Sequence, residues 1–198
     1  MKKEERIQQI QNVALSLVSK KALSAIRTAE IAQLANVSEA TLFKYFKSKD
    51  DIFESIIVQF INFQHPTEDI NKITTPEKFK LYLDRYMTSL INIENNRIPF
   101  LHLLIQISMD KHPLAITKYN QTVNGIWHIM ENRIEYGKKY WNFNIKFETK
   151  IQVRLFHLSI LMFLIEQEVF DAKLQDPFSL KDVKNIAINN LFTLLIDK

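Results

Sequence analysis

The sequence predicts an all-α protein of about nine helices. Two observations lead to this prediction. The 198 residues include only two glycines and five prolines, and almost no stretch alternates apolar and polar residues as a strand would. Apolar residues instead recur three and four positions apart over long segments, which is the period of one helix face. With 46% hydrophobic residues, the chain can bury one good-sized core, or a small domain joined to a larger one.

The prolines indicate where helices begin, because a residue without an N–H can open a helix but cannot continue one. In "TTPEKF" we expect Thr75 to be the N-cap, Pro76 the first helical residue and Glu77 a favourable charge near the positive end of the helix dipole. The expected helices cover approximately residues 4–20, 29–35, 39–46, 50–63, 77–95, 99–110, 113–139, 148–171 and 180–196.

The polar link "QHPTEDINKITT" separates a short basic part of the chain from longer helices rich in Ile, Leu and Phe. We therefore expect two domains, residues 1–64 and residues 65–198. Residues 16–49 carry six basic and two acidic side chains, an excess that equals the net charge of +4 of the whole chain. An anionic partner at this end would require such a concentration of positive charge. On charge alone, a charged face that is only solvated and binds no partner explains it equally well.

Several function classes lack the residues that they need. The chain has no cysteine, which excludes disulfides, thiolate zinc sites and cysteine nucleophiles. It has no glycine-rich phosphate-binding motif, and no histidine is preceded three residues earlier by an acidic residue, as a di-iron bundle site would want. We expect no enzymatic activity, no cofactor and no metal.

The N-terminal "MKKEERIQQI" carries charges of both signs with no apolar run behind it, so a signal peptide is not expected. The longest apolar run, residues 155–165, is far shorter than the ~20 residues of a membrane-spanning helix. The sequence therefore predicts a soluble cytoplasmic protein without a membrane partner.

A small helix in "VSEATLFKYFKSKDD" is too short to be a core helix, yet it holds three aromatic residues and three lysines. If it begins at Glu39, Leu42 and Phe46 share one face, and a second face carries Thr41, Lys44 and Tyr45. Ser38 is a good N-cap, and Asn36 tolerates the left-handed conformation of a tight interhelical turn. Two short helices joined by such a turn form a helix-turn-helix, whose second helix enters the major groove of DNA.

The run "IRTAEIAQLANVSEATLFKYFKSKDDIF" resembles the DNA-binding segment of the tetracycline-repressor (TetR) family of transcriptional regulators. The resemblance covers roughly residues 5–60. It implies an N-terminal three-helix DNA-binding domain, followed by a larger helical domain for ligand binding and dimerisation. It also implies that Arg27 and Thr28 contact phosphates and that base edges are read at the start of the helix after the turn. The implied DNA contacts are Arg27, Thr28, Ser38, Glu39, Ala40, Thr41, Phe43, Lys44, Tyr45 and Lys49.

The segment departs from the usual family pattern at three positions. Ala22 and Asn36 stand where glycine is common, and both are tolerable in turns. Phe43 stands where tyrosine is common, so a hydroxyl contact to phosphate is lost at that position. An apolar contact to a thymine methyl group would remain open to Phe43, and a partly buried core position is the alternative.

Residues 148–171 are apolar almost all round, which favours a helix packed between two partners. The last helix offers a matching apolar surface through Val183, Ala187, Leu191 and Leu194. We expect a homodimer through these last two long helices, as the resemblance also implies. A two-fold dimer would place its recognition helices about 34–36 Å apart on a pseudo-palindromic operator. The alternative is that both helices fill a large monomeric core.

Aromatic, methionine and polar residues of the second half could line a pocket for an apolar small molecule, although each alone is more often ordinary core. Its polar head would meet His102, Gln106 or His157. The predicted pocket residues are Tyr82, Tyr86, Phe100, His102, Gln106, Met109, Trp127, Met130 and His157.

The resemblance implies a repressor that leaves double-stranded DNA when this effector binds, with activation and corepression as open alternatives. The competing hypothesis is a helical protein that binds small molecules or serves as a scaffold and does not bind DNA.

Overall fold

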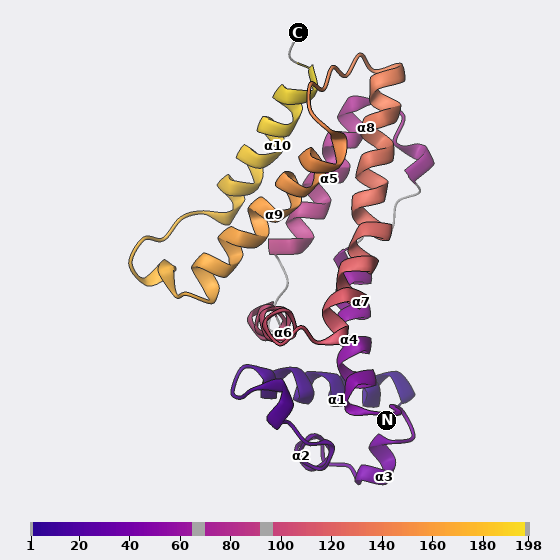
Figure 1. Ribbon diagram of the computed structural model, residues 1–198, viewed down its shortest axis with the longest axis vertical. Coiled ribbons are helices and arrows are strands. Elements are labelled where there is room, and N and C mark those ends of the chain that lie inside the picture. Colours follow the sequence, from indigo (N-terminus) through magenta and orange to yellow (C-terminus); the bar gives the residue numbers. More distant parts are fainter. Residues whose placement is uncertain (1, 65–69, 92–96, 197–198) are drawn as a thin grey trace. The chain divides into compact units, whose positions relative to one another are not determined.

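The computed structural model describes residues 2–64, 70–91 and 97–196 (Figure 1). Every regular element in these ranges is a helix, which confirms the predicted all-α class. The elements are α1 (Lys3–Val18), η1 (Leu23–Ala25), α2 (Thr28–Leu34), α3 (Glu39–Leu42), α4 (Lys49–Gln64), η2 (Ile70–Lys72), α5 (Pro76–Ile91), α6 (Arg97–Met109), α7 (Pro113–Thr122), the π-helical η3 (Val123–Trp127), α8 (His128–Tyr140), α9 (Thr149–Glu168), η4 (Ala172–Leu174) and α10 (Leu180–Ile196).

The chain folds into two compact units. The first unit joins Met1–Asn62 with Glu94–Gln121, and the second joins Phe63–Ile93 with Thr122–Lys198. We expected a domain boundary at residue 64, and the first segment of the first unit ends at Asn62. Helix α6 and nearly all of α7, which we expected in the second domain, belong to the first unit. Their apolar side chains, among them Leu103 and Ile107, are buried in the same core as those of α1, α2 and α4.

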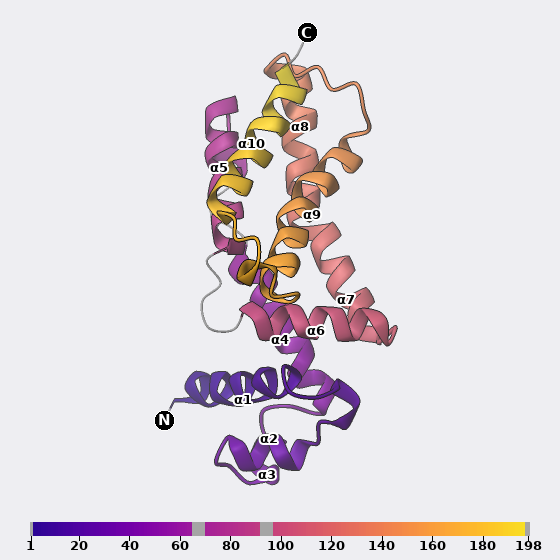
Figure 2. The same cartoon turned by 90° about the vertical axis from the view of Figure 1, so that its left-hand side faces the viewer.

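In the first unit, α1 packs against α2 and α6, and α3 packs against α2 (Figure 2). Ile10, Ile31 and Phe53 are fully buried in its core. The rings of Phe60 in α4 and Phe100 in α6 stack with centroids 4.1 Å apart. This core fixes the small N-terminal helices against longer ones, which short helices require because they are only marginally stable alone.

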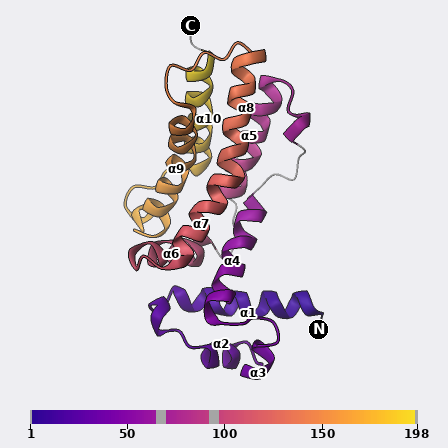
Figure 3. The same cartoon turned by 45° about the vertical axis from the view of Figure 1, so that its right-hand side comes forward.

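In the second unit, α10 packs against α5 and α9, and α9 also packs against α5 and α8 (Figure 3). Its core contains the fully buried side chains of Phe79, Leu83, Tyr86 and Ile134. Helix α5 begins at Pro76, and the Lys78 N–H donates to the Thr75 hydroxyl at 3.3 Å. The N-terminus predicted for this helix is thereby confirmed, whereas its predicted end near residue 95 lies outside the described residues.

Two predicted helices differ from the structure. The segment 113–139 was expected to be continuous, but five π-helical residues separate α7 from α8, with Gly125 at φ −95° and ψ −110°. Glycine costs a helix about 1 kcal/mol relative to alanine, so an interruption is cheap at this position. The helix expected over 39–46 is α-helical only over Glu39–Leu42, and the following residues form a turn.

Gly137 lies under an aromatic ring near the end of α8. Its carbonyl accepts hydrogen bonds from the Trp141 N–H at 2.8 Å and the Phe143 N–H at 3.2 Å. A Cβ atom at position 137 would lie 2.2 Å from the Phe143 ring. The chain therefore leaves α8 through a turn in which glycine allows the Phe143 ring to lie against the helix.

Within the described ranges, no helix is both long enough and apolar enough to cross a membrane.

Candidate nucleic-acid interface

The turn between α2 and α3 has the geometry expected of a helix-turn-helix. Asn36 has φ +50°, which confirms its predicted left-handed conformation. The next N–H, of Val37, donates to the Ala32 carbonyl at 3.0 Å. The Ser38 hydroxyl accepts from the Thr41 N–H at 3.1 Å, so Ser38 is the N-cap of α3, as predicted. The Val37 bond thus ties the turn to α2, and the Ser38 bond caps the start of α3.

The α3 segment has one buried face and one exposed face. Leu42 and Phe46 are buried, as the spacing predicted. Phe43 is 48% exposed, so its side chain is not part of the core, and Lys44 is exposed beside it. Thr41 and Tyr45 are half-buried, with Tyr45 packed against the core of the first unit. The segment therefore presents an aromatic ring and an ammonium group to solvent.

The first turns of α2 and α3 are joined by side chains. The Thr28 hydroxyl donates a hydrogen bond to the Glu39 carboxylate. Arg27, directly before Thr28, is exposed, as are Ser38, Glu39 and Ala40. Residues predicted to contact phosphate and residues predicted to contact bases are thus held in one surface by a direct bond.

Lys49 opens α4 and is directed partly toward the protein itself. Its ammonium group donates to the Leu23 carbonyl at 3.0 Å and to the Ile26 carbonyl at 3.2 Å. An ammonium group has three protons, so these two bonds leave room for one more acceptor, such as a phosphate oxygen. The role of Lys49 as a DNA contact stays a prediction, and the structure adds an intramolecular role that its position in the sequence did not indicate.

Five of the predicted pocket residues lie buried in the second unit, namely Tyr82, Tyr86, Trp127, Met130 and His157. The Tyr86 hydroxyl is hydrogen-bonded to Nδ1 of His157, and the Trp127 ring lies edge-on to His157 at 5.5 Å. Burial, with a smaller contribution from the neighbouring Tyr82, raises the pKa of the Tyr86 phenol well above its usual value of 10.0. The neutral Tyr86 hydroxyl therefore lies inside an aromatic environment.

The other four predicted pocket residues belong to the first unit. Phe100 stacks on Phe60, and His102 is half-buried. Met109 is 78% exposed. The Gln106 side chain is hydrogen-bonded to backbone groups of α1 and η1. The ligand-binding role of all nine residues stays a prediction. Among the described side chains, no three acidic or histidine groups are placed to hold a metal ion.

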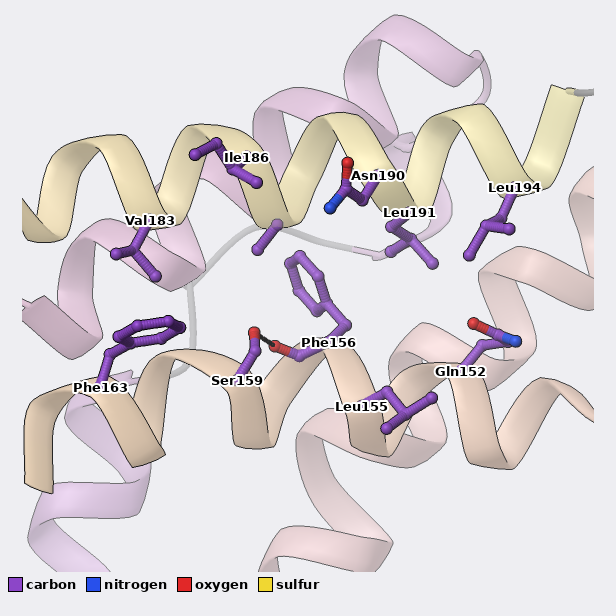
Figure 4. Close-up of a pocket in the computed structure, with 11 residues that line it drawn as sticks. Gln152, Leu155, Phe156, Ser159, Phe163, Val183, Ile186, Asn190, Leu191 and Leu194 are labelled. Carbon is purple, nitrogen blue, oxygen red and sulfur yellow. Dashed lines mark hydrogen bonds between the residues drawn. The ribbon is translucent and has the colours of Figure 1, made fainter. Parts of the chain in front are cut away.

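A shallow apolar groove of about 400 Å³ runs between α9 and α10 (Figure 4). Phe156 and Phe163 line it from α9, and Val183 and Leu194 line it from α10. Four apolar residues of α9 have large exposed fractions, namely Ile151 47%, Leu155 61%, Leu158 41% and Met162 57%, and Leu155 also lines the groove. Ile186 on α10 is 59% exposed and also belongs to this apolar surface. The periodicity argument missed it, because it lies beside the apolar surface predicted for the last helix.

Known proteins resemble this chain in sequence. A sequence model of the family described as "Bacterial regulatory proteins, tetR family" matches residues 10–56. The "Fatty acid metabolism regulator protein" of Bacillus subtilis is 26% identical over 141 residues, which are 68% of this chain and 69% of that protein. Four other curated relatives are matched over half of their length or less.

Solved structures resemble the whole chain. The structure of NalD, the secondary repressor of a multidrug efflux pump in Pseudomonas aeruginosa, has a TM-score of 0.71, with 18% identity and 100% of both chains covered. The structure of FadR from Bacillus subtilis in complex with stearoyl-CoA has a TM-score of 0.69 and 21% identity, with 95% of this chain and 98% of that chain covered. At these identities the likeness concerns the fold. Residues 10–56, which hold the helix-turn-helix, therefore match the tetR family of bacterial regulatory proteins, and the chain as a whole has the fold of these solved structures.

Proposed function

We propose that the chain is a repressor that binds a pseudo-palindromic DNA operator as a homodimer and is released from it by an apolar small molecule. The observation that carries the proposal is the exposed surface of the helix-turn-helix. There Ser38 caps α3 after the Asn36 turn, Leu42 is buried, and the turn that directly follows α3 presents Phe43 and Lys44 to solvent. A short helix presented in this way matches the recognition helix that enters the major groove.

The groove between α9 and α10 supports dimerisation. Large apolar side chains such as Leu155 and Met162 are exposed on α9, while Phe156 and Ile160 of the same helix are buried within its own unit. A helix that is apolar on both sides needs a second partner, and an identical copy related by a two-fold axis supplies the same surface. The exposure of these side chains argues against the alternative in which α9 and α10 only fill a monomeric core.

The effector we propose is a long acyl chain, carried as an acyl-CoA. Its support is the matched relative named for fatty acid metabolism, together with the FadR structure that holds stearoyl-CoA. The buried aromatic environment of Tyr86, Trp127 and His157 suits an apolar tail near one neutral polar group. If the acyl chain binds the DNA-incompetent conformation more tightly, operator affinity falls by the same differential free energy.

Selection of random DNA duplexes on the purified protein at moderate salt is the experiment that tests this proposal. Enrichment of a pseudo-palindrome, bound less tightly when salt is raised, is the expected result. Stearoyl-CoA added to the enriched duplex and protein should then lower the bound fraction, with free coenzyme A as the matched control. A folded dimer that enriches no duplex would contradict the proposal and favour the ligand-binding or scaffold hypothesis.

A further inference from the structure

We propose that Gln106 of α6 is a positioning residue for DNA binding, which fixes the start of α2 without touching DNA itself. The proposal concerns the first unit alone and rests on the proposed function. Its basis is a set of hydrogen bonds that converge on the turn between α1 and α2.

The Leu23 peptide unit is held from two sides. Oε1 of Gln106 accepts a hydrogen bond from the Leu23 N–H at 2.7 Å. Nε2 of the same side chain donates to the Val18 carbonyl at 2.9 Å and lies 3.4 Å from the Lys21 carbonyl. From α4, the Lys49 ammonium donates to the carbonyl of Leu23. One amide from α6 and one ammonium from α4 thus fix the same residue of the turn.

This turn leads directly into the predicted phosphate contacts. Leu23 begins η1, and Ile26, whose carbonyl also accepts from Lys49, immediately precedes Arg27 and Thr28. A peptide fixed at Leu23 and Ile26 leaves little freedom to the Arg27 backbone that follows it. Contacts to phosphate determine the orientation of a protein on the duplex, so a shift at the start of α2 would weaken them.

The chemistry of position 106 is specific to an amide. Gln106 lies on α6 beside Leu103 and Ile107, which are buried in the core of the first unit. An apolar side chain at position 106 could fill similar space, but it would leave the buried Leu23 without its acceptor and the Val18 carbonyl without its donor. Only a side chain with both a donor and an acceptor at this reach joins the end of α1 to the start of η1.

The first measurement needs no DNA. Amide hydrogen exchange at Leu23 should be faster in Gln106→Met than in the wild type, because methionine has similar length but only a weakly accepting sulfur in place of the amide oxygen. Ser108→Ala is the matched control on α6, since the Ser108 hydroxyl is exposed and donates within its own helix to the Leu104 carbonyl. Unchanged exchange at Leu23 in Gln106→Met would overturn the proposal.

The second measurement separates positioning from general loss of folding. On the enriched duplex, Gln106→Met and Arg27→Ala should each weaken binding. The loss of affinity in the double variant should be smaller than the product of the two single losses by about threefold or more. Binding is expressed per folded, active dimer. If Gln106→Met does not fold, Gln106→Glu takes its place in the same cycle, because it keeps the acceptor for Leu23 but loses the donor to the Val18 and Lys21 carbonyls.

The outcomes distinguish the two proposals. Independent effects of Gln106 and Arg27 on an enriched duplex would overturn the positioning role and leave the proposed function standing. Failure of the folded wild type to enrich any duplex would overturn both.

Discussion

The Thr28 hydroxyl donates a hydrogen bond to the Glu39 carboxylate, and this bond joins the first turn of α2 to the first turn of α3. It places a negative charge on the surface predicted to face DNA phosphates. Glu39 therefore has two opposing effects on DNA binding in our proposal, since its oxygen fixes the geometry while its charge repels the backbone.

Replacement Glu39→Gln should separate these effects, because a carboxamide oxygen still accepts from Thr28 but carries no charge. We expect affinity for all duplexes to rise by roughly threefold to tenfold at low salt, with a smaller gain at high salt. Fluorescence anisotropy titrations at two salt concentrations measure this change. Glu54→Gln, an exposed carboxylate on α4, is the control, and a change in the preferred sequence would instead show that Glu39 reads a base.

The apolar surface of α9 and α10 gives a prediction about oligomeric state. Leu155→Glu should dissociate the dimer and thereby weaken operator binding, because it would bury an unpaired charge in the interface. Sedimentation velocity over a range of concentrations measures the monomer fraction. Leu81→Glu, at a 49% exposed site on α5, is the matched control and should stay dimeric. A Leu155→Glu protein that remains a dimer would place the interface elsewhere.

A buried lysine links α10 to α5 in the second unit. The Lys184 ammonium donates to the Asp84 carboxylate at 2.6 Å and to the Thr88 hydroxyl at 3.0 Å. Lys184→Ala should lower the free energy of unfolding by about 1–3 kcal/mol, because it removes a charged hydrogen bond between two helices. Urea unfolding at fixed protein concentration measures the loss. Lys181→Ala, an exposed lysine on the same helix, should cost about 0.5 kcal/mol or less.

Glu135 on α8 gives a pH-dependent prediction. Hydrogen bonds from the Lys138 ammonium and the Thr149 hydroxyl lower its pKa below the usual 4.5. A lowered carboxylate pKa stabilises the fold above the unfolded-state value, and this stability is lost as pH falls below about 4.5. Because the side chain is 54% exposed, we expect the contribution to be below about 1 kcal/mol.

Urea unfolding of Glu135→Gln and the wild type at pH 7 and near pH 3.5 checks this. The difference between the two proteins should be present at pH 7 and shrink at the lower pH. Glu166→Gln, an exposed site on α9, controls for the loss of one negative charge. A difference that grows as pH falls would contradict the assignment.

Local signals predicted much of the fold. The predictions were correct for the start of α5 at Pro76, the Ser38 cap of α3 and the left-handed Asn36 in the turn. Caps and left-handed turns depend on residues close in sequence, so a local pattern is enough to predict them. The π-helical segment at Gly125 was not foreseen. The periodic apolar residues on both sides of it support one long helix equally well, so periodicity alone could not locate the interruption.

The candidate site, like the fold, could be predicted from the sequence only in part. Spacing predicted the buried Leu42 and Phe46 and the exposed Lys44 correctly. Thr41 and Tyr45, which spacing also placed on the exposed face, are half-buried. Gln106 was expected to meet a ligand, yet its amide is bonded to a peptide 83 residues away in the sequence. Such a partner depends on how α6 packs across α1, and no local pattern around Gln106 or Lys49 contains that information.

Gly137 limits which sequences can adopt this fold. Any side chain there would collide with the Phe143 ring, which itself contacts the rings of Trp141 and Phe192. A Cβ atom there would also lie 2.9 Å from the Trp141 ring, so position 137 can vary in evolution only together with position 143 and a shift of Trp141. Among relatives that keep an aromatic ring at the second position, glycine should be invariant at the first, and exchange of both residues should occur as a linked pair.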